Sequence, residues 1–230
     1  MTVTEEYFDA IATGDINKLE QLLKHSNSLG LDVNFTDSNG LNAYAVAINE
    51  GLEVLVKILL AYKVELKDAL LFAVENQMSD VVEVICSSVR HLPLEERMPI
   101  VDCRCVSDIF PAYLTPIILA SHNNDFKIVQ ILYDNTARVP DPENDSERLT
   151  APSGTLERST EMLSMYTALA SEAYLSVSSI NPIEFAFVLT LKLRDLSNCV
   201  EEFKNDFSRL AAQVDEYAGK LLGKARSTEE

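Results

Sequence analysis

The residues of this chain that could do metal chemistry are few and isolated. Cys103 and Cys105 flank one arginine, and their two thiolates could bind a metal ion. A structural zinc site takes four ligands, and this pair has no partners nearby in sequence. The alternative is that both are reduced thiols in a loop, and we expect no metal site and no cofactor. The chain has four cysteines and no disulfide-dense spacing, which indicates a reducing, cytosolic setting.

General-base chemistry has equally few candidates. The chain contains only three histidines, His25, His91 and His122, and we expect His122 to be structural because it falls within a helical hairpin. The seven glycines fall at turns or isolated positions, so no glycine-rich loop is present to hold a phosphate. The Glu95-Glu96 pair is typical of a solvated face. The sequence therefore predicts a protein that is not an enzyme.

Composition and charge exclude further classes of function. The chain has 230 residues, of which 47% are hydrophobic and 24% are charged, values typical of a globular protein. Acidic residues outnumber basic ones by 36 to 19, and the formal net charge is −17. Because this field repels phosphate backbones and anionic lipids, we expect no nucleic acid among the partners. No run of apolar residues approaches the length that spans a bilayer.

An internal repeat organises the first half of the chain. Four alanines, Ala10, Ala47, Ala73 and Ala120, each fall midway along an expected short helix. Four residues after each comes a position suited to a left-handed turn, and pairs of apolar residues follow at offsets of twelve and thirteen. The turn positions are Gly14, Gly51, Gln77 and Asn124. Such helical hairpins cannot cover their own apolar faces, so we expect the copies to stack.

This template resembles the ankyrin repeat, and a generic helical solenoid is the alternative. Thr115-Pro116 keeps the threonine and proline of the ankyrin helix start, and Asp37 to Gly40 keep a β-turn before the second hairpin. The spacing of the copies is irregular, at 37, 26 and 47 residues, against about 33 in an ideal array. We expect the longest step to contain an inserted loop, from about residue 91 to 113, with three prolines.

The second half has a different organisation. Residues 134–158 are polar and rich in helix breakers, which predicts a mobile linker that a protease should cut first. Helical pattern resumes near Thr160, and Asn181-Pro182 followed by Glu184 is typical of a capped helix start. We therefore expect an all-α fold: an ankyrin-repeat solenoid of about four repeats over residues 1–133, the linker, and an α-helical linker bundle over 159–230.

A long apolar series dominates that bundle. Ten residues recur in alternating steps of four and three, the seam spacing of helices that pack at shallow angles. They are Leu189, Leu193, Leu196, Val200, Phe203, Phe207, Leu210, Val214, Tyr217 and Leu221. Two interpretations remain open: the seam packs within its own chain, or part of it contacts another subunit. For the second, Phe207, Leu210 and Val214 are the expected interface residues.

Irregular repeats followed by these helices resemble the N-terminal cytoplasmic region of transient receptor potential channels of the C-type branch. The resemblance covers nearly the whole chain, in the family's order. It is carried by residues 67–73 (KDALLFA), 114–124 (LTPIILASHNN), 166–171 (YTALAS), Tyr174, Ser178-Ser179, 181–183 (NPI), 202–207 (EFKNDF) and 225–227 (ARS).

The resemblance implies a function that the residues alone do not. It implies a cytoplasmic assembly and regulatory domain of a calcium-permeable, non-selective cation channel that acts downstream of phospholipase C. This domain, itself soluble, would lie on the cytoplasmic side of the plasma membrane. The implied partners are other subunits, in a homotetramer or heterotetramer, and regulatory proteins such as calmodulin or G-protein subunits. The alternative function is a free-standing cytosolic ankyrin-repeat adaptor with a helical tail.

One departure from the family affects its metal site. Family members commonly carry a histidine and a Cys-x-Cys-x-x-Cys cluster that binds zinc just after the last repeat. The corresponding residues 139–147 read VPDPENDSE, with neither cysteine nor histidine. We therefore do not extend zinc binding to this chain.

Overall fold

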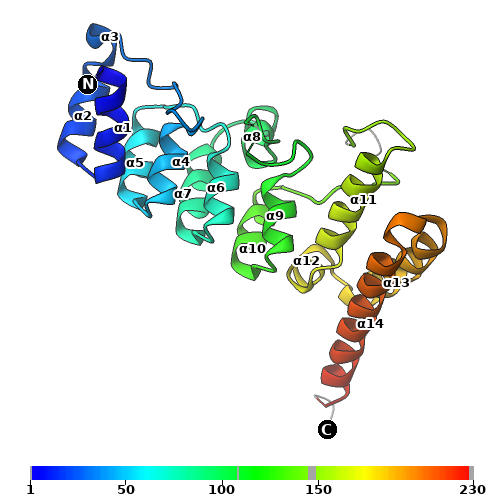
Figure 1. Ribbon diagram of the computed structural model, residues 1–230. Coiled ribbons are helices and arrows are strands. Elements are labelled where there is room, and N and C mark those ends of the chain that lie inside the picture. Colours follow the sequence, from blue (N-terminus) through cyan, green and yellow to red (C-terminus); the bar gives the residue numbers. More distant parts are fainter. Residues whose placement is uncertain (1, 108, 145–148, 228–230) are drawn as a thin grey trace. The chain divides into compact units, whose positions relative to one another are not determined.

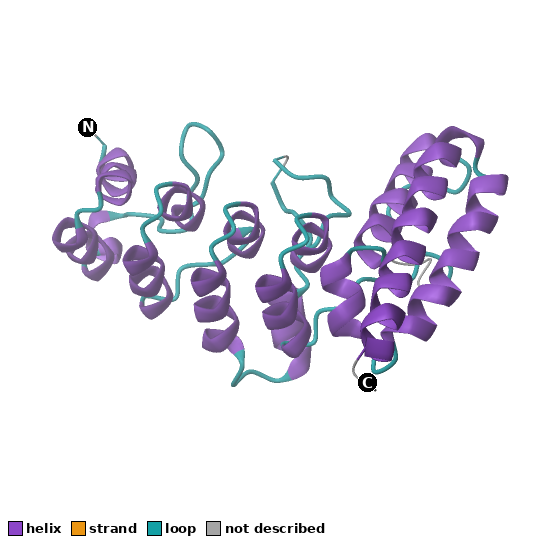
Figure 2. Cartoon of the chain, turned by 90° about the horizontal axis from the view of Figure 1, so that it is seen from below, coloured by secondary structure: helices purple, strands orange, loops and turns teal. Residues whose placement is uncertain are grey.

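The computed structural model describes residues 2–107, 109–144 and 149–227, and within these ranges the chain is helical and contains no strand (Figure 2). The expectation of an all-α fold is confirmed in this respect. The chain divides into two compact units, Met1–Pro111 and Ala112–Glu230, and each is described by itself. None of the described helices is long and apolar enough to cross a membrane.

The first unit is built from helical hairpins (Figure 1). Within it, the two helices of each hairpin pack together, and the first helices of successive hairpins also contact one another. The helices are α1 (Val3–Thr13), α2 (Ile16–Lys24), α3 (Ser26–Leu29), α4 (Ala43–Asn49), α5 (Glu53–Ala61), α6 (Ala69–Glu75), α7 (Ser79–Val89) and α8 (Leu94–Val101). The alanines expected at close helix contacts are fully buried: Ala10, Ala47 and Ala73.

Each hairpin turns at the residue that the repeat predicted. The backbone of Gly14 has φ 73° and that of Gly51 has φ 71°, both in the left-handed region that glycine adopts without strain. Gln77 and Asn124 occupy the equivalent turns with φ 54° and 52°. The predicted register of the four hairpins is confirmed, because a shift of one residue would move every positive φ.

The two turns without glycine should respond in opposite directions to a glycine substitution. A left-handed φ strains a residue with a Cβ, so Gln77→Gly should stabilise the first unit by about 0.5–1 kcal/mol. Asn124→Gly should instead destabilise the second unit by about 1 kcal/mol, because the side-chain oxygen Oδ1 of Asn124 accepts a 2.8 Å hydrogen bond from the Ala173 backbone N–H. Urea unfolding of each variant measures both effects, and changes of the same sign would contradict this account.

The inserted segment between the third and fourth hairpins is not the simple loop that we expected. Residues Leu94–Val101 form α8, which begins directly after Pro93 and accommodates Pro99 in its interior. Proline is well tolerated in the first turn of a helix but not beyond it, and the sequence pattern therefore favoured a loop here. The three prolines of this segment predicted a loop, but the residues from Leu94 to Met98 form a helix between them.

The second unit begins with the fourth hairpin and continues into longer helices. α9 starts at Pro116 as predicted, and Asn181 caps α13, where its side chain accepts a hydrogen bond from the Glu184 backbone N–H. The helices are α9 (Pro116–His122), α10 (Phe126–Asp134), α11 (Leu156–Leu169), α12 (Glu172–Ser178), α13 (Pro182–Cys199), the 3₁₀ turn η2 (Glu201–Phe203) and α14 (Lys204–Ser227).

The stretch predicted as a mobile linker makes specific contacts. Ala137, Val139 and Leu149 are buried, and α11 starts at Leu156, before the expected resumption of helix near Thr160. The Glu161 carboxylate is 3% exposed and accepts hydrogen bonds from the backbone N–H groups of Thr150 (2.8 Å) and Ala151 (3.2 Å) and from the Thr150 hydroxyl. The described residues between α10 and α11, 135–144 and 149–155, form no helix, but the breaker-rich composition did not show these attachments.

The apolar seam forms a hairpin rather than one continuous helix. The chain leaves the helical conformation at Val200 (φ −110°, ψ 93°), and α14 then returns along α13 (Figure 1). The two halves of the seam bury Leu189, Leu193, Phe207, Leu210 and Val214 within the unit. Of the two interpretations, packing within the same chain is the one that the structure shows for these residues. Apolar steps of three and four occur whether the series forms one helix or two, so the spacing could not show the break at Val200.

Candidate functional site

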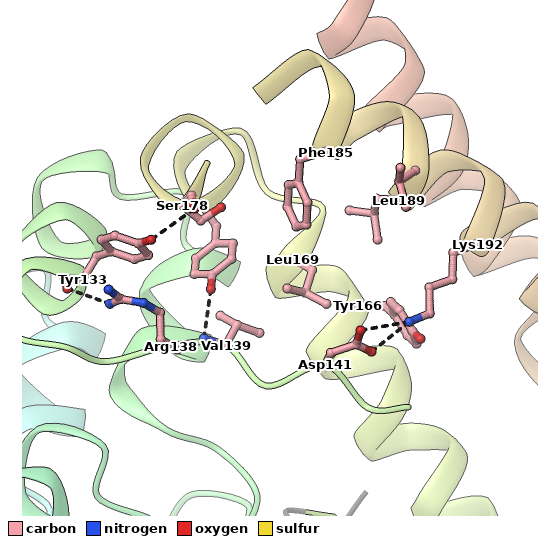
Figure 3. Close-up of a pocket in the computed structure, with 12 residues that line it drawn as sticks. Tyr133, Arg138, Val139, Asp141, Tyr166, Leu169, Ser178, Phe185, Leu189 and Lys192 are labelled. Carbon is pink, nitrogen blue, oxygen red and sulfur yellow. Dashed lines mark hydrogen bonds and ion pairs between the residues drawn. The ribbon is translucent and has the colours of Figure 1, made fainter. Parts of the chain in front are cut away.

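The second unit contains a cavity of about 280 Å³. Its walls come from α10, the segment that follows α10, α11, α12 and α13, so residues far apart in sequence line it (Figure 3). The lining residues are Tyr133, Arg138, Val139, Asp141, Tyr166, Leu169, Tyr174, Ser178, Phe185, Val188, Leu189 and Lys192.

One wall of the cavity is aromatic and is held by hydrogen bonds to the backbone. The rings of Tyr133 and Tyr174 pack edge to face, with centroids 6.3 Å apart. The Tyr133 hydroxyl donates to the carbonyl of Ser178 (3.1 Å), and the Val139 backbone N–H donates to the Tyr174 hydroxyl (3.2 Å). These bonds join α10, α12 and the segment after α10, so the ring positions are fixed by three separate parts of the unit.

The opposite wall carries a cation with two carboxylate partners. The Lys192 ammonium lies 2.8 and 3.1 Å from the two oxygens of Asp141 and 3.1 Å from a Glu143 oxygen. It also lies 5.5 Å from the centroid of the Tyr166 ring. Sequence reasoning missed this group, although a single lysine in the apolar run from Phe185 to Leu193 was a signal of a paired charge.

The second cation of the site, Arg138, also has interaction partners within the unit. The Arg138 guanidinium stacks 3.4 Å from the Tyr133 ring centroid, and its Nη1 donates to the carbonyl oxygens of Tyr133 and Ala137, both at 2.7 Å. The charges of Arg138, Lys192, Asp141 and Glu143 sum to zero, although Glu143 binds Lys192 without being a lining residue of the cavity itself.

The ion pair of Lys192 and Asp141 makes a pH-dependent contribution to stability. Burial alone would raise the Asp141 pKa, but hydrogen bonds from Lys192 and from the Glu143 backbone N–H outweigh it and lower that pKa. A carboxyl with a lowered folded-state pKa stabilises the fold above its ordinary pKa of about 3.9 and loses that contribution as the pH falls.

Replacing Lys192 with methionine should therefore remove an acid-sensitive contribution. We expect a loss of about 1 kcal/mol at neutral pH, a modest value because both partners are partly exposed to solvent. The difference in unfolding free energy between wild type and Lys192→Met should shrink as the pH falls from about 5 towards 3. Urea titrations across this range measure it, and a difference that stays constant would contradict the assignment.

Two tyrosine hydroxyls of the cavity keep their protons near neutral pH. Burial raises the pKa of Tyr166 and of Tyr174 to about 12, so both phenols stay protonated near neutral pH. Neither can then act as a general base, and no histidine or cysteine is among the lining residues of this cavity. What remains is a neutral, largely apolar site with fixed walls.

The cysteine pair identified in the sequence lies in the first unit and has a structural environment. Cys103 is 7% exposed, and burial, with a further contribution from Asp68, raises the pKa of its thiol to about 12. The Cys105 thiol lies 2.8 Å from the carbonyl oxygen of Ser107, and the Asp68 carboxylate accepts hydrogen bonds from the backbone N–H groups of Val106 and Ser107. A thiol that stays protonated is a poor metal ligand.

The other candidate residues do not converge on a site. His122 Nε2 lies 2.8 Å from the carbonyl oxygen of Ser164, which links α9 to α11, and burial lowers its pKa. His25, His91 and the Glu95-Glu96 pair are exposed. Across the described ranges, no three histidine, cysteine or acidic side chains gather in a way that could hold a metal ion. In the stretch where the family carries its zinc ligands, Asp141 and Glu143 bind Lys192 instead.

The three residues expected at a subunit interface lie in the core of the second unit. Phe207 and Val214 are fully buried and Leu210 is 3% exposed. The Phe207 ring packs edge to face against Tyr166, with centroids 5.9 Å apart. A contact with a neighbouring subunit is not tested by a single chain and stays a prediction. It would require α14 to move away from these neighbours.

Comparisons with known proteins agree with the resemblance read from the sequence. The family model described as "Transient receptor ion channel II" matches residues 148–204. The chain is 32% identical to mouse short transient receptor potential channel 4, over 97% of this chain and 24% of that protein. It is also 32% identical to the Drosophila melanogaster transient-receptor-potential-like protein (98% of this chain, 21% of that protein) and to rat short transient receptor potential channel 3 (100% and 27%). The chain thus spans about a quarter of the length of these relatives.

Proposed function

This chain belongs with the transient receptor potential channels of the C-type branch, to which it is related over nearly its whole length, and we propose that it forms the cytoplasmic assembly and regulatory domain of a channel subunit. The observation that carries the proposal is the 32% identity spread over 97% of the chain. A match limited to helical repeats would not distinguish a channel from an adaptor. Here the family model matches the second half, beyond the repeats.

The proposal assigns different roles to the two halves of the chain. Residues 1–133 would form an ankyrin-repeat solenoid of about four repeats, and residues 159–230 the linker-helix domain. The left-handed turns at equivalent positions of four hairpins support the first part. The α13–α14 hairpin, a rigid element with a buried seam, suits the second part, because a stiff element can transmit force from cytoplasmic repeats to a gate. Residues 134–158 would connect the two.

The full-length subunit would assemble with other subunits, conduct calcium and other cations, and respond to phospholipase C. Calmodulin or G-protein subunits would be its regulatory partners. In such a channel these residues would not line the pore. They would set which subunits assemble and how readily the gate opens.

Expression of the complete reading frame in cultured cells tests this function. We expect stimulation of a phospholipase C-coupled receptor to evoke a calcium-carrying cation current, and deletion of the region described here to abolish assembly of differently tagged subunits. An encoded protein without membrane-spanning segments, or one that carries no current and does not change membrane permeability, would favour the free-standing adaptor.

A further inference from the structure

We propose that the cavity bounded by Tyr133, Tyr174, Leu169 and Val188 binds a small, uncharged, aromatic or aliphatic molecule. This inference rests on the geometry of the second unit and does not depend on the channel function proposed above. Its three supports are the size of the cavity, the character of its walls and the balance of its charges.

The size suits a compact ring system. An engineered protein cavity of roughly 150 Å³ lined by apolar side chains binds benzene. The present cavity, at about 280 Å³, has room for a fused bicyclic molecule. A concave site of this size, lined mainly by apolar and aromatic side chains with a few polar groups, is a candidate ligand site.

The walls present rings and aliphatic groups, and the Tyr133 and Tyr174 hydroxyls already have partners, whereas the Ser178 hydroxyl is buried without a hydrogen-bond partner. The Tyr133 hydroxyl is bonded to the Ser178 carbonyl, and the Tyr174 hydroxyl accepts from the Val139 backbone N–H. Phe185, Leu169 and Leu189 surround the space between these rings and Lys192 (Figure 3). A ligand would therefore gain contact mainly through apolar surface, which is favourable in proportion to the area removed from water.

The charges of the site select against an ionised ligand. Lys192 is held by Asp141 and Glu143, and Arg138 is held by two carbonyl oxygens and the Tyr133 ring. An ammonium in the cavity would lose its hydration and meet carboxylates that already bind Lys192. A carboxylate would have to compete with the two carbonyl oxygens and the ring that hold Arg138, and burial of a poorly paired charge is costly. The charge balance therefore points to a neutral occupant.

Three probes that share one ring system test this selection: indole, which is neutral, indole-3-acetate, an anion, and tryptamine, a cation. The chain contains no tryptophan, so indole fluorescence excited on the long-wavelength side of the tyrosine absorption band reports the ligand. With the complete 230-residue chain, we expect saturable indole binding with a dissociation constant of about 0.1–1 mM, since so small a ligand buries little area. Both charged analogues should bind about tenfold or more weakly.

Two matched substitutions on α13 locate the binding. Val188 lines the cavity and is 57% exposed, so Val188→Phe should narrow the cavity with little effect on folding. Leu191 is 47% exposed on the same helix and does not line it, so Leu191→Phe is the control. We expect Val188→Phe to weaken indole binding about tenfold and Leu191→Phe to leave it unchanged.

Each other outcome overturns the proposal. Without saturable indole binding, the cavity is not a ligand site. Equal binding of the three probes, or tighter binding of a charged one, would show that the paired charges do not select a neutral ligand. If Val188→Phe and Leu191→Phe bind indole equally, the ligand sits elsewhere. Leu169→Phe, which fills the cavity from α11, provides a second check on location.

Discussion

Phe207→Ala should lower the free energy of unfolding of the second unit by about 3–5 kcal/mol, the cost of removing a large, fully buried ring from a packed core. The Phe207 side chain is 0% exposed and packs edge to face on Tyr166, which ties α14 to α11. The void left by the ring could not be filled without moving one of these helices. Urea unfolding followed by far-ultraviolet circular dichroism measures the loss.

The same variant distinguishes a core residue from an interface residue. If Phe207 is core, Phe207→Ala should lower stability at every protein concentration and leave the mass measured by light scattering unchanged. Leu222, which is 47% exposed near the end of α14, supplies the control, because Leu222→Ala should have an effect below about 0.5 kcal/mol. If Phe207→Ala leaves the stability unchanged but abolishes association between chains, Phe207 is an interface residue.

Glu161→Ala should destabilise the second unit by about 2–3 kcal/mol, because it removes a buried acceptor that satisfies three donors. The Glu161 carboxylate holds the backbone N–H groups of Thr150 and Ala151 and the Thr150 hydroxyl against α11. Once these bonds are lost, residues 149–155 keep the buried Leu149 side chain and the hydrogen bond from Arg158 Nη1 to the Ala151 carbonyl oxygen (3.2 Å) as attachments. Because the three bonds to Glu161 are gone, we also expect trypsin to cut within residues 134–158 faster in the variant than in the wild type.

Two further variants sharpen that experiment. Glu157→Ala changes an exposed glutamate one turn earlier on α11 and should have little effect on stability or cleavage. Glu161→Gln keeps one acceptor oxygen on a side chain of the same length. Its decrease in unfolding free energy should therefore be smaller than that of Glu161→Ala but larger than that of Glu157→Ala. Cleavage that is equally fast in wild type and Glu161→Ala would mean that the segment is mobile despite these bonds, as its composition predicted.

The hairpin register was available from the sequence because its determinants are local. A left-handed turn favours glycine or asparagine, and a close helix contact favours alanine, so Ala47 and Gly51 together mark one hairpin without reference to the rest of the chain. The start of α13 was equally readable, since Asn181, Pro182 and Glu184 cap the helix through bonds within one turn. The family relationship followed from motifs that keep their order along the chain.

Tertiary structure decided what the apolar residues pack against. Steps of three and four describe one face of a helix, but they do not state which surface covers that face, so the series from Leu189 to Leu221 was compatible with a neighbour subunit and with its own chain. The break at Val200 is a change of two backbone angles, and it brings α14 back onto α13. Phe207, Leu210 and Val214 became core residues as a consequence.

The polar contacts of the second unit could likewise not be predicted from the sequence. Glu161 meets Thr150 across 11 positions, Lys192 meets Asp141 across 51, and Tyr133 meets Ser178 across 45. No periodicity links positions so far apart, because their meeting depends on how separate segments of the unit pack. The first pair attaches the segment before α11 to that helix, and the other two pairs lie at the cavity. The sequence by itself determined the helices, their turns and the family; the cavity and its neutral charge balance arise only when the folded chain brings those segments together.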